Sequence, residues 1–291
     1  MGRGTAGGRP REAAGAVPPT LSVFLAIISV QMGAAVAKTL FPALGAGGTV
    51  FLRIGFAALA LLIAGRPRLH GYGRTDYGAA VLFGVAIAAM NAAFYAAIAR
   101  IPLGAAVTLE FVGPLGVAIA GSRRPLDLVW AALAAGGIVL LAPVGGAVID
   151  PLGALLALLA GAGWAAYILL NVRVGRAFRG GDGLALALAV AAVAVLPLGV
   201  AGAGARLVSP RFLAPGVAVA LLSSVIPFSL EHAALKRLPA RVFGVLMSVE
   251  PVVAALVGFV VLHEALGVRG LLALVLVTAA TIGSARTAAP R

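Results

Sequence analysis

Cysteine is absent from the 291-residue sequence. A disulfide, a thiolate metal site and a cysteine nucleophile are therefore excluded, and the redox compartment cannot be read from the sequence. Aspartate is scarce as well, because the chain contains only Asp76, Asp127, Asp150 and Asp182. Each falls at the end of an apolar run, so these residues cannot form a paired-aspartate metal site within a membrane core.

Signatures of catalysis and nucleotide binding are also missing. No Walker A sequence occurs, and serine and histidine do not meet at mid-membrane in an arrangement typical of a protease. We therefore expect neither an enzyme nor an ATP-driven pump, and we expect no cofactor or metal.

Charged residues make up only 11% of the chain, whereas 62% is hydrophobic. A soluble domain carries roughly a quarter charged residues, so a water-facing surface cannot be built from this composition. The sequence predicts a membrane protein. Aromatic residues contribute only 6%, and the predominance of Ala, Gly, Leu and Val favours helices that pack closely through small residues.

Polar breaks divide the sequence into ten apolar segments. A bilayer core of about 30 Å needs roughly 20 apolar residues per helix, and each segment meets this length within a few residues. The predicted spans are 19–40, 47–65, 76–99, 102–121, 126–144, 151–172, 184–204, 213–235, 240–262 and 266–285. The predicted fold is an all-α polytopic membrane protein with ten transmembrane helices.

Basic residues gather on one side of this predicted topology. Of the 22 Lys and Arg residues, 16 lie in the tails and alternate loops of one side and 4 on the other, while Lys38 and Arg53 lie within spans. We therefore expect a multi-pass protein of the bacterial inner membrane. The positive-inside rule places both of its termini, including the tail 1–18, in the cytoplasm. This loop pattern also accounts for the net charge of +13, so we expect no nucleic-acid partner.

The N-terminal region allows a second interpretation. Arg9 and Arg11, the apolar stretch 21–30 and Ala35-Val36-Ala37 resemble a cleavable signal peptide. Removal of the first span would leave nine spans and would break the repeat described next.

An internal repeat appears when the chain is shifted by 137 residues. The segment ARIPLGAAVTLEFVGPL at 99–115 then overlies KRLPARVFGVLMSVEPV at 236–252, with Pro102 on Pro239 and Pro114 on Pro251. The match aligns the fourth span with the ninth, so each repeat contains five helices and the two cross the membrane in opposite directions. We expect repeats at 19–145 and 146–291, although chance similarity between Ala/Val-rich helices stays an alternative.

Two carboxylates stand beside the repeated prolines. Glu110 precedes Pro114 by four residues and Glu250 directly precedes Pro251. Because a charge at the bilayer centre costs about 2.5 to 3.5 kcal/mol on insertion scales, both should avoid lipid and face one central space. There they would contact substrate or take up protons. The alternative is a structural ion pair with Arg53 or Lys38, which lie in the outer parts of their spans.

Further polar residues within the spans are weaker candidates for the substrate path. They are Gln31 in the first span, Asn91 and Tyr95 in the third, and Trp164 and Tyr167 in the sixth. Hydrogen bonds between helices would explain each of them equally well. Ser223, Ser224 and Pro227 predict a kink in the eighth span. We interpret Glu231 and His232 as a solvated helix end, and His263 with Glu264 as an interfacial pair.

The sequence resembles the drug/metabolite transporter superfamily of EamA type, and within it the threonine/homoserine exporter group. The likeness covers nearly all of the chain after about residue 20 and is most specific in LPARVFGVLMSVEPVVAALVGFVVLHEAL, at 238–266. In that family the fourth and ninth helices line a central cavity. His263 departs from the glycine that many relatives carry before the glutamate.

The resemblance implies a secondary exporter of small amino acids such as threonine and homoserine. We expect the protein to lie in the lipid bilayer and to work by alternating access of two inverted halves. Coupling of export to proton entry is a hypothesis. Two alternatives stay open: export of drugs or other metabolites, and a membrane sensor or scaffold that transports nothing. A mid-membrane carboxylate pair favours transport over a scaffold.

The topology can be tested directly. A reporter that is active only outside the cytoplasm, fused after Arg291, should be inactive because the positive-inside rule retains this end in the cytoplasm. Reporter activity in such a fusion would contradict the ten-span prediction.

Overall fold

The computed structural model describes residues 18–68, 70–120, 125–141, 150–179, 181–235, 237, 238, 243 and 246–287, and all regular structure in these ranges is helical. The elements are α1 (Pro19–Gly65), α2 (Arg74–Ile98), α3 (Leu103–Glu110), α4 (Val112–Ala120), α5 (Leu126–Leu141), α6 (Pro151–Ala177), α7 (Asp182–Ala203), η1 (Gly204–Val208), α8 (Pro210–Ala220), η2 (Leu221–Val225), α9 (Ile226–Leu235), α11 (Glu250–Leu262) and α12 (Val268–Thr287). The all-α prediction is therefore confirmed for the described part of the chain.

Several predicted features fall outside the described residues. They are residues 1–17 of the tail, the basic residues Arg123, Arg124, Lys236, Arg241 and Arg291, the side chain of His232, and Pro239 of the repeat.

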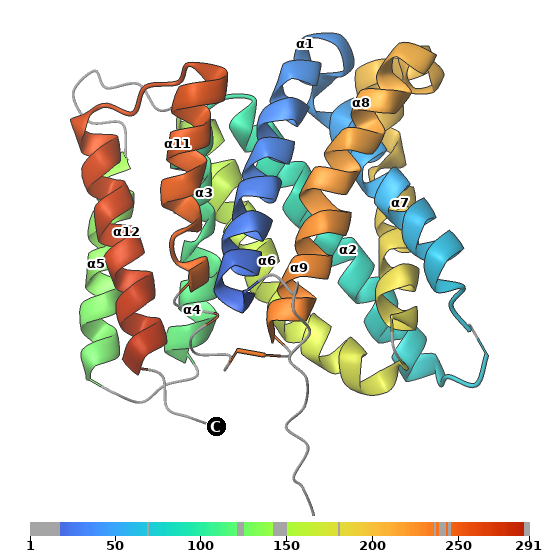
Figure 1. Cartoon of the computed structure of the whole chain (residues 1–291), viewed down its shortest axis with the longest axis horizontal. Helices are drawn as coiled ribbons and strands as arrows, with labels where there is room; N and C mark the ends of the chain where they lie inside the picture. Colours follow the sequence, from blue (N-terminus) through green and yellow to red (C-terminus); the bar gives the residue numbers. More distant parts are fainter. Residues whose placement is uncertain are drawn as a thin grey trace, which may run out of the picture.

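α1 contains the first two predicted spans. The predicted break at 41–46 is helical except at Gly45, whose φ of 65° and ψ of 171° interrupt the helix. A residue with a Cβ is strained at such a φ, which explains why glycine occupies this position. The break between the first two predicted spans is thus confined to Gly45. Figure 1 shows the two halves of α1 running up and back down from this point.

The fourth predicted span is interrupted where its proline predicts. α3 ends at Glu110 and α4 begins at Val112, because Pro114 has no N–H to donate to the Glu110 carbonyl. The ninth span behaves similarly, since α11 begins at Glu250 with Pro251 in its first turn. α3 and α11 lie side by side, and a Cβ on Gly104 would come within 2.7 Å of the Ala255 Cα atom.

The eighth predicted span is also irregular. It begins earlier than predicted, at Pro210, and passes from α8 through the π-helical turn η2 into α9. Pro227 removes the donor for the Ser223 carbonyl in α-helical spacing and for the Leu222 carbonyl in π-helical spacing. Both carbonyls accept hydrogen bonds from α1 instead: Ser29 Oγ donates to Leu222 O at 2.7 Å and Arg53 donates to Ser223 O at 3.2 Å.

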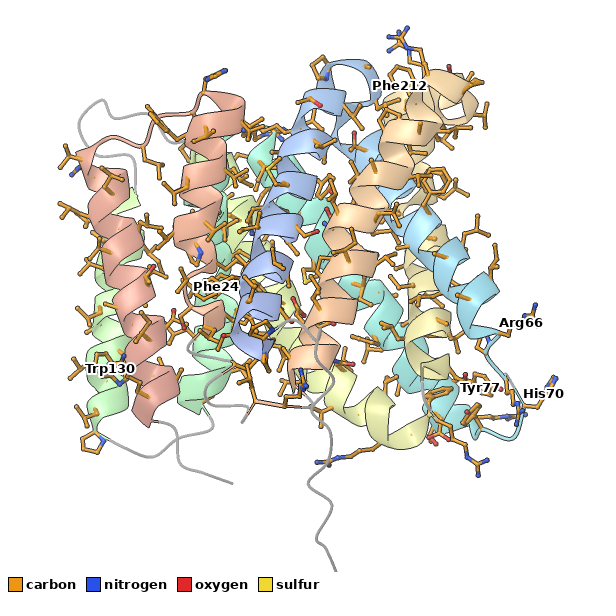
Figure 2. All side chains as sticks on the ribbon, in the orientation of Figure 1. Phe24, Arg66, His70, Tyr77, Trp130 and Phe212 are labelled. Carbon is orange, nitrogen blue, oxygen red and sulfur yellow. The ribbon has the colours of Figure 1, made fainter. Side chains whose placement is uncertain are left out.

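The outer surface of the bundle is apolar. Large side chains such as Leu128, Val193, Phe259 and Val275 are 61% to 73% exposed, and in Figure 2 such side chains point outward along the height of the helices. By length and composition, five helices of the described chain could cross a membrane. This surface is the one expected of a multi-pass membrane protein, whereas the count of ten spans stays a prediction.

α1 begins and α12 ends at the same end of the molecule, the lower end in Figure 1. Arg66 and His70 also lie at this end (Figure 2). The turn of α1 at Gly45 lies at the upper end. The terms lower end and upper end are used in this sense below.

Glycines allow the interrupted helix to approach α6. A Cβ on Gly113 would lie 1.8 Å from the Gly161 carbonyl oxygen, and one on Gly161 would lie 2.6 Å from the Glu110 carbonyl oxygen. The carbonyl that Pro114 leaves without a donor is therefore packed directly against the α6 backbone. Close approach through small residues is the usual basis of helix association in membranes.

This contact predicts an unequal response of two glycines in α4. Gly113→Ala should destabilise the protein by about 1–3 kcal/mol, because overpacking forces the α4 and α6 backbones apart. The measurement is the thermal unfolding midpoint of the purified protein in detergent. Gly116→Ala is the matched control, since a Cβ there has no neighbour within 4 Å, and equal midpoints for the two variants would contradict the packing argument.

Candidate functional site

A cavity of about 190 Å³ lies among α1, α2, α3, α6, α7, η2, α9 and α11. Of the nine candidate residues from the sequence, seven line it: Gln31, Arg53, Asn91, Glu110, Trp164, Tyr167 and Glu250. Residues distant in the sequence thus meet in one space.

Glu110 reaches the cavity as the last residue of α3, where the helix is interrupted. The residue is 8% exposed. Within the described residues it forms no ion pair, either with Arg53 or with Lys38. The structural ion pair that the sequence left open is therefore not formed here.

Glu250 also lines the cavity at a helix interruption, because it is the first residue of α11. Gln31 Nε2 of α1 donates to Glu250 Oε1 at 2.9 Å. Glu250 Oε2 and Gln31 Oε1 are both buried without a hydrogen-bond partner. Buried polar atoms are usually paired, so these two oxygens offer acceptors to a ligand in the cavity.

Arg53 is the cation among the described residues that line the cavity. Its guanidinium donates to Ser223 O and, at 3.4 Å, to Tyr95 Oη, and it lies 5.5 Å from the centre of the Tyr95 ring. Pro227 creates the acceptor by leaving the Ser223 carbonyl without its helical donor. These contacts fix the guanidinium beside the cavity while leaving part of its five N–H groups for a ligand.

The three remaining lining candidates, Asn91, Trp164 and Tyr167, are positioned by a hydrogen bond or by ring contacts with neighbouring residues. Asn91 Nδ2 donates to the Ile87 carbonyl of the same helix at 2.9 Å. The Trp164 ring packs edge-on against Phe111 at 5.1 Å, and the Tyr167 ring lies 5.1 Å from Phe83. The aromatic rings thereby supply rigid apolar walls.

Two candidates lie outside the lining. Tyr95 is fully buried behind Arg53. Lys38 forms an ion pair with Glu264 and donates to the Ile101 carbonyl at 3.2 Å. The Glu264 side chain is 15% exposed, so our interpretation of Glu264 as a solvated interfacial residue was wrong. The pairing joins segments 226 residues apart, a distance that no local pattern reveals.

Sequence reasoning also missed Glu231, which lines the cavity from α9 and is half-buried. Its interpretation as a solvated helix end was wrong. A signal was present, because Ser224, Pro227 and Glu231 follow a spacing of three and four residues and therefore share one helix face. All three line the cavity.

Among the described residues, the lining combines a guanidinium with carboxyl groups that form no ion pair with it. The lining contains one guanidinium and three carboxylates, and no ion pair joins them in the described part of the chain. No group of three or more His, Cys, Asp or Glu side chains among the described residues could hold a metal ion. The cavity is suited to a small molecule that brings its own complementary charges.

Known proteins similar to this chain include threonine/homoserine exporters. Residues 151–286 match the EamA-like transporter family. The threonine/homoserine exporter RhtA of Salmonella typhimurium strain SL1344 is 42% identical over 271 residues, which are 92% of each chain. RhtA of Escherichia coli strain K12 is 43% identical over the same length and shares.

A crystal structure of another protein has the same fold. Its chain superposes with a TM-score of 0.59 over 93% of this chain and 97% of its own length, at 20% identity. The likeness concerns the fold alone.

The expectation of a transporter rather than an enzyme is confirmed by these relatives, which are named exporters. The chain belongs to the EamA-like transporter family, among the relatives of the exporter RhtA.

Proposed function

We propose that the protein is a secondary exporter of small amino acids of the threonine and homoserine type in the bacterial inner membrane. The observation that carries this proposal is the cavity with one guanidinium and three carboxylates that are not paired with one another. An amino acid is a zwitterion, so its carboxylate fits Arg53 and its ammonium fits Glu110 and Glu250. The relatives named as threonine/homoserine exporters support the same substrate class.

The side chain of such a substrate also finds partners. A hydroxyl group can donate to the unpaired Gln31 Oε1. A site that leaves such groups unpaired favours ligands that pair with them over apolar analogues.

The size of the cavity favours an amino acid over a drug. An engineered cavity of about 150 Å³ holds benzene, whereas pockets for drug-sized ligands measure about 300–1,000 Å³. The present volume of about 190 Å³ corresponds to a molecule of few heavy atoms. A scaffold that binds no ligand has no need of such a cavity.

We also propose alternating access of two inverted five-helix halves, 19–145 and 146–291, with the lower end in the cytoplasm. The paired interruptions at Glu110 and Glu250 support this repeat, since discontinuous helices at the repeat interface commonly form transporter sites. Intramembrane carboxylates mark proton relays and substrate paths. Glu110, which has no ion-pair partner among the described residues, is the proposed proton-responsive group.

Glu110→Gln tests the proton role. The amide keeps the shape and the hydrogen bonds of a protonated carboxyl group but cannot change charge. The variant should lose export driven by a pH gradient and keep exchange of labelled threonine or homoserine between equal concentrations, both measured in reconstituted vesicles. Glu250→Gln should reduce gradient-driven export less, because Glu250 directly precedes Pro251 at the start of α11 and serves the geometry of this interruption as well as carrying a charge. Export by Glu110→Gln at the parent rate under the gradient would remove the proton role.

Arg53→Gln tests the carboxylate-binding role. Loss of a charge-assisted hydrogen bond to the substrate should raise KM about 10- to 100-fold, since such a bond contributes about 1.5–3 kcal/mol. The measurement is the concentration dependence of transport in vesicles with matched protein content. Arg206→Gln is the control, because Arg206 also donates to a backbone carbonyl, that of Ala43, but lies outside the cavity. An unchanged KM for Arg53→Gln would show that Arg53 does not bind the substrate.

A further inference from the structure

A polar cluster ties three helices together at the upper end, outside the cavity. Lys38 of α1 pairs with one oxygen of Glu264, which follows α11, and donates to Ile101 O before α3. The other oxygen, Glu264 Oε2, accepts from the Leu103 N–H at 2.7 Å. We call Lys38, Ile101, Leu103 and Glu264 the upper cluster.

Glu264 has two separate roles in this cluster. Leu103 is the first residue of α3, and the preceding Pro102 provides no side-chain cap. The Glu264 carboxylate therefore caps the first turn of α3 from a distant part of the chain. Its second role is the ion pair, which is 21% exposed at Lys38 and 15% at Glu264 and is thus less screened than a surface pair.

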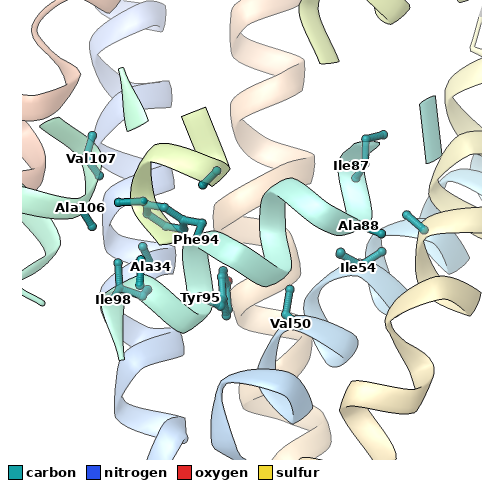
Figure 3. Close-up of a cluster of buried hydrophobic side chains, with 14 of the residues drawn as sticks. Ala34, Val50, Ile54, Ile87, Ala88, Phe94, Tyr95, Ile98, Ala106 and Val107 are labelled. Carbon is teal, nitrogen blue, oxygen red and sulfur yellow. The ribbon is translucent and has the colours of Figure 1, made fainter. Parts of the chain in front are cut away.

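A packed apolar layer separates the upper cluster from the cavity. Ala34 of α1, Phe94 of α2 and Val107 of α3 line the cavity. About one turn nearer the upper end, Ala37 of α1, Ile98 of α2 and Gly104 of α3 are buried. Figure 3 shows Phe94, Tyr95 and Ile98 along α2 beside Ala34, Ala106 and Val107. The cavity is therefore closed toward the upper end along α1, α2 and α3.

Release at the upper end requires this layer to separate. Because the Lys38–Glu264 pair joins α1 to the end of α11, and Glu264 also holds α3, the three helices cannot move apart at this end while both contacts persist. A close approach of Gly104 to Ala255 holds α3 against α11 as well. Lys38 is therefore the described side chain that fixes α1 to the other two helices at the upper end, whereas the Gln31–Glu250 hydrogen bond joins α1 to α11 at the cavity.

We propose that the Lys38–Glu264 ion pair is the latch of the outer gate, which must break before the cavity opens at the upper end. The proposal rests on the protein being a transporter and on the proposed orientation, and it is independent of the substrate. Removing the charge of Glu264 shifts the protein toward the outward-open state, since any contact present in only one of two states biases their populations.

Thiol labelling tests the latch because the chain contains no cysteine. Ala34→Cys places a thiol on the cavity wall below the apolar layer. A membrane-impermeant maleimide added to right-side-out vesicles should label this thiol about fivefold faster when Glu264→Gln is added, which corresponds to loss of a partly exposed ion pair. Glutamine can still accept from the Leu103 N–H, so this variant removes the charge and keeps the cap of α3.

Two further variants complete this experiment. Asp150→Asn is the matched control, because it breaks the more exposed Arg100–Asp150 pair of 3.6 Å and should leave the labelling rate at that of Ala34→Cys alone. Lys38→Met should accelerate labelling like Glu264→Gln. Equal rates for both latch variants and the control would overturn the proposal. Acceleration confined to inside-out vesicles would support the latch and overturn the proposed orientation.

Cross-linking gives an independent test through the opposite change. In Lys38→Cys/Glu264→Cys, a cleavable bis-maleimide should hold the two positions together and lower transport at least about tenfold, because the gate cannot open. Cleavage of the linker should restore the rate of the uncross-linked double variant. Transport that continues at that rate in fully cross-linked protein would show that these positions do not separate during the cycle.

Discussion

The structure depends on one constraint, that a backbone carbonyl inside a membrane finds no water to bond to. Pro114 and Pro227 each remove a donor from a helix within the bundle, and neighbouring elements compensate. The Glu110 carbonyl packs against Gly161, and the carbonyls of η2 accept from Ser29 and Arg53. The interruptions that result are the places where polar side chains enter the cavity.

This constraint also distributes the charges. Arg53 is held by a carbonyl and an aromatic ring, so its position does not require a carboxylate. Glu110 has no ion-pair partner among the described residues. Lys38, which the sequence allowed as a partner of Glu110, pairs with Glu264 instead. The cavity groups are thus not paired with one another in the described part of the chain, while the Lys38–Glu264 ion pair lies at the upper end, where it joins separate helices.

The sequence predicted much of the lining of the candidate site because the cost of a charge in lipid is a local property. Glu110, Glu250 and Arg53 each stand out within an apolar run, and a charge there must face a polar interior. Glu231 was missed and Lys38 was misplaced for the opposite reason. Both lie near the ends of their predicted spans, where water, lipid headgroups and protein partners are equally compatible with a charged residue.

Composition and hydrophobic run length determined by themselves that the chain is helical and belongs in a membrane, because lipid admits few other structures for apolar segments. Motif similarity determined the family. Only the tertiary structure decided which polar groups meet: the Gln31–Glu250 contact, the Arg53–Ser223 contact and the Lys38–Glu264 pair each join segments at least 170 residues apart. Such pairings depend on how the helices pack, so the partner of each residue cannot be predicted from the residues next to it in the sequence.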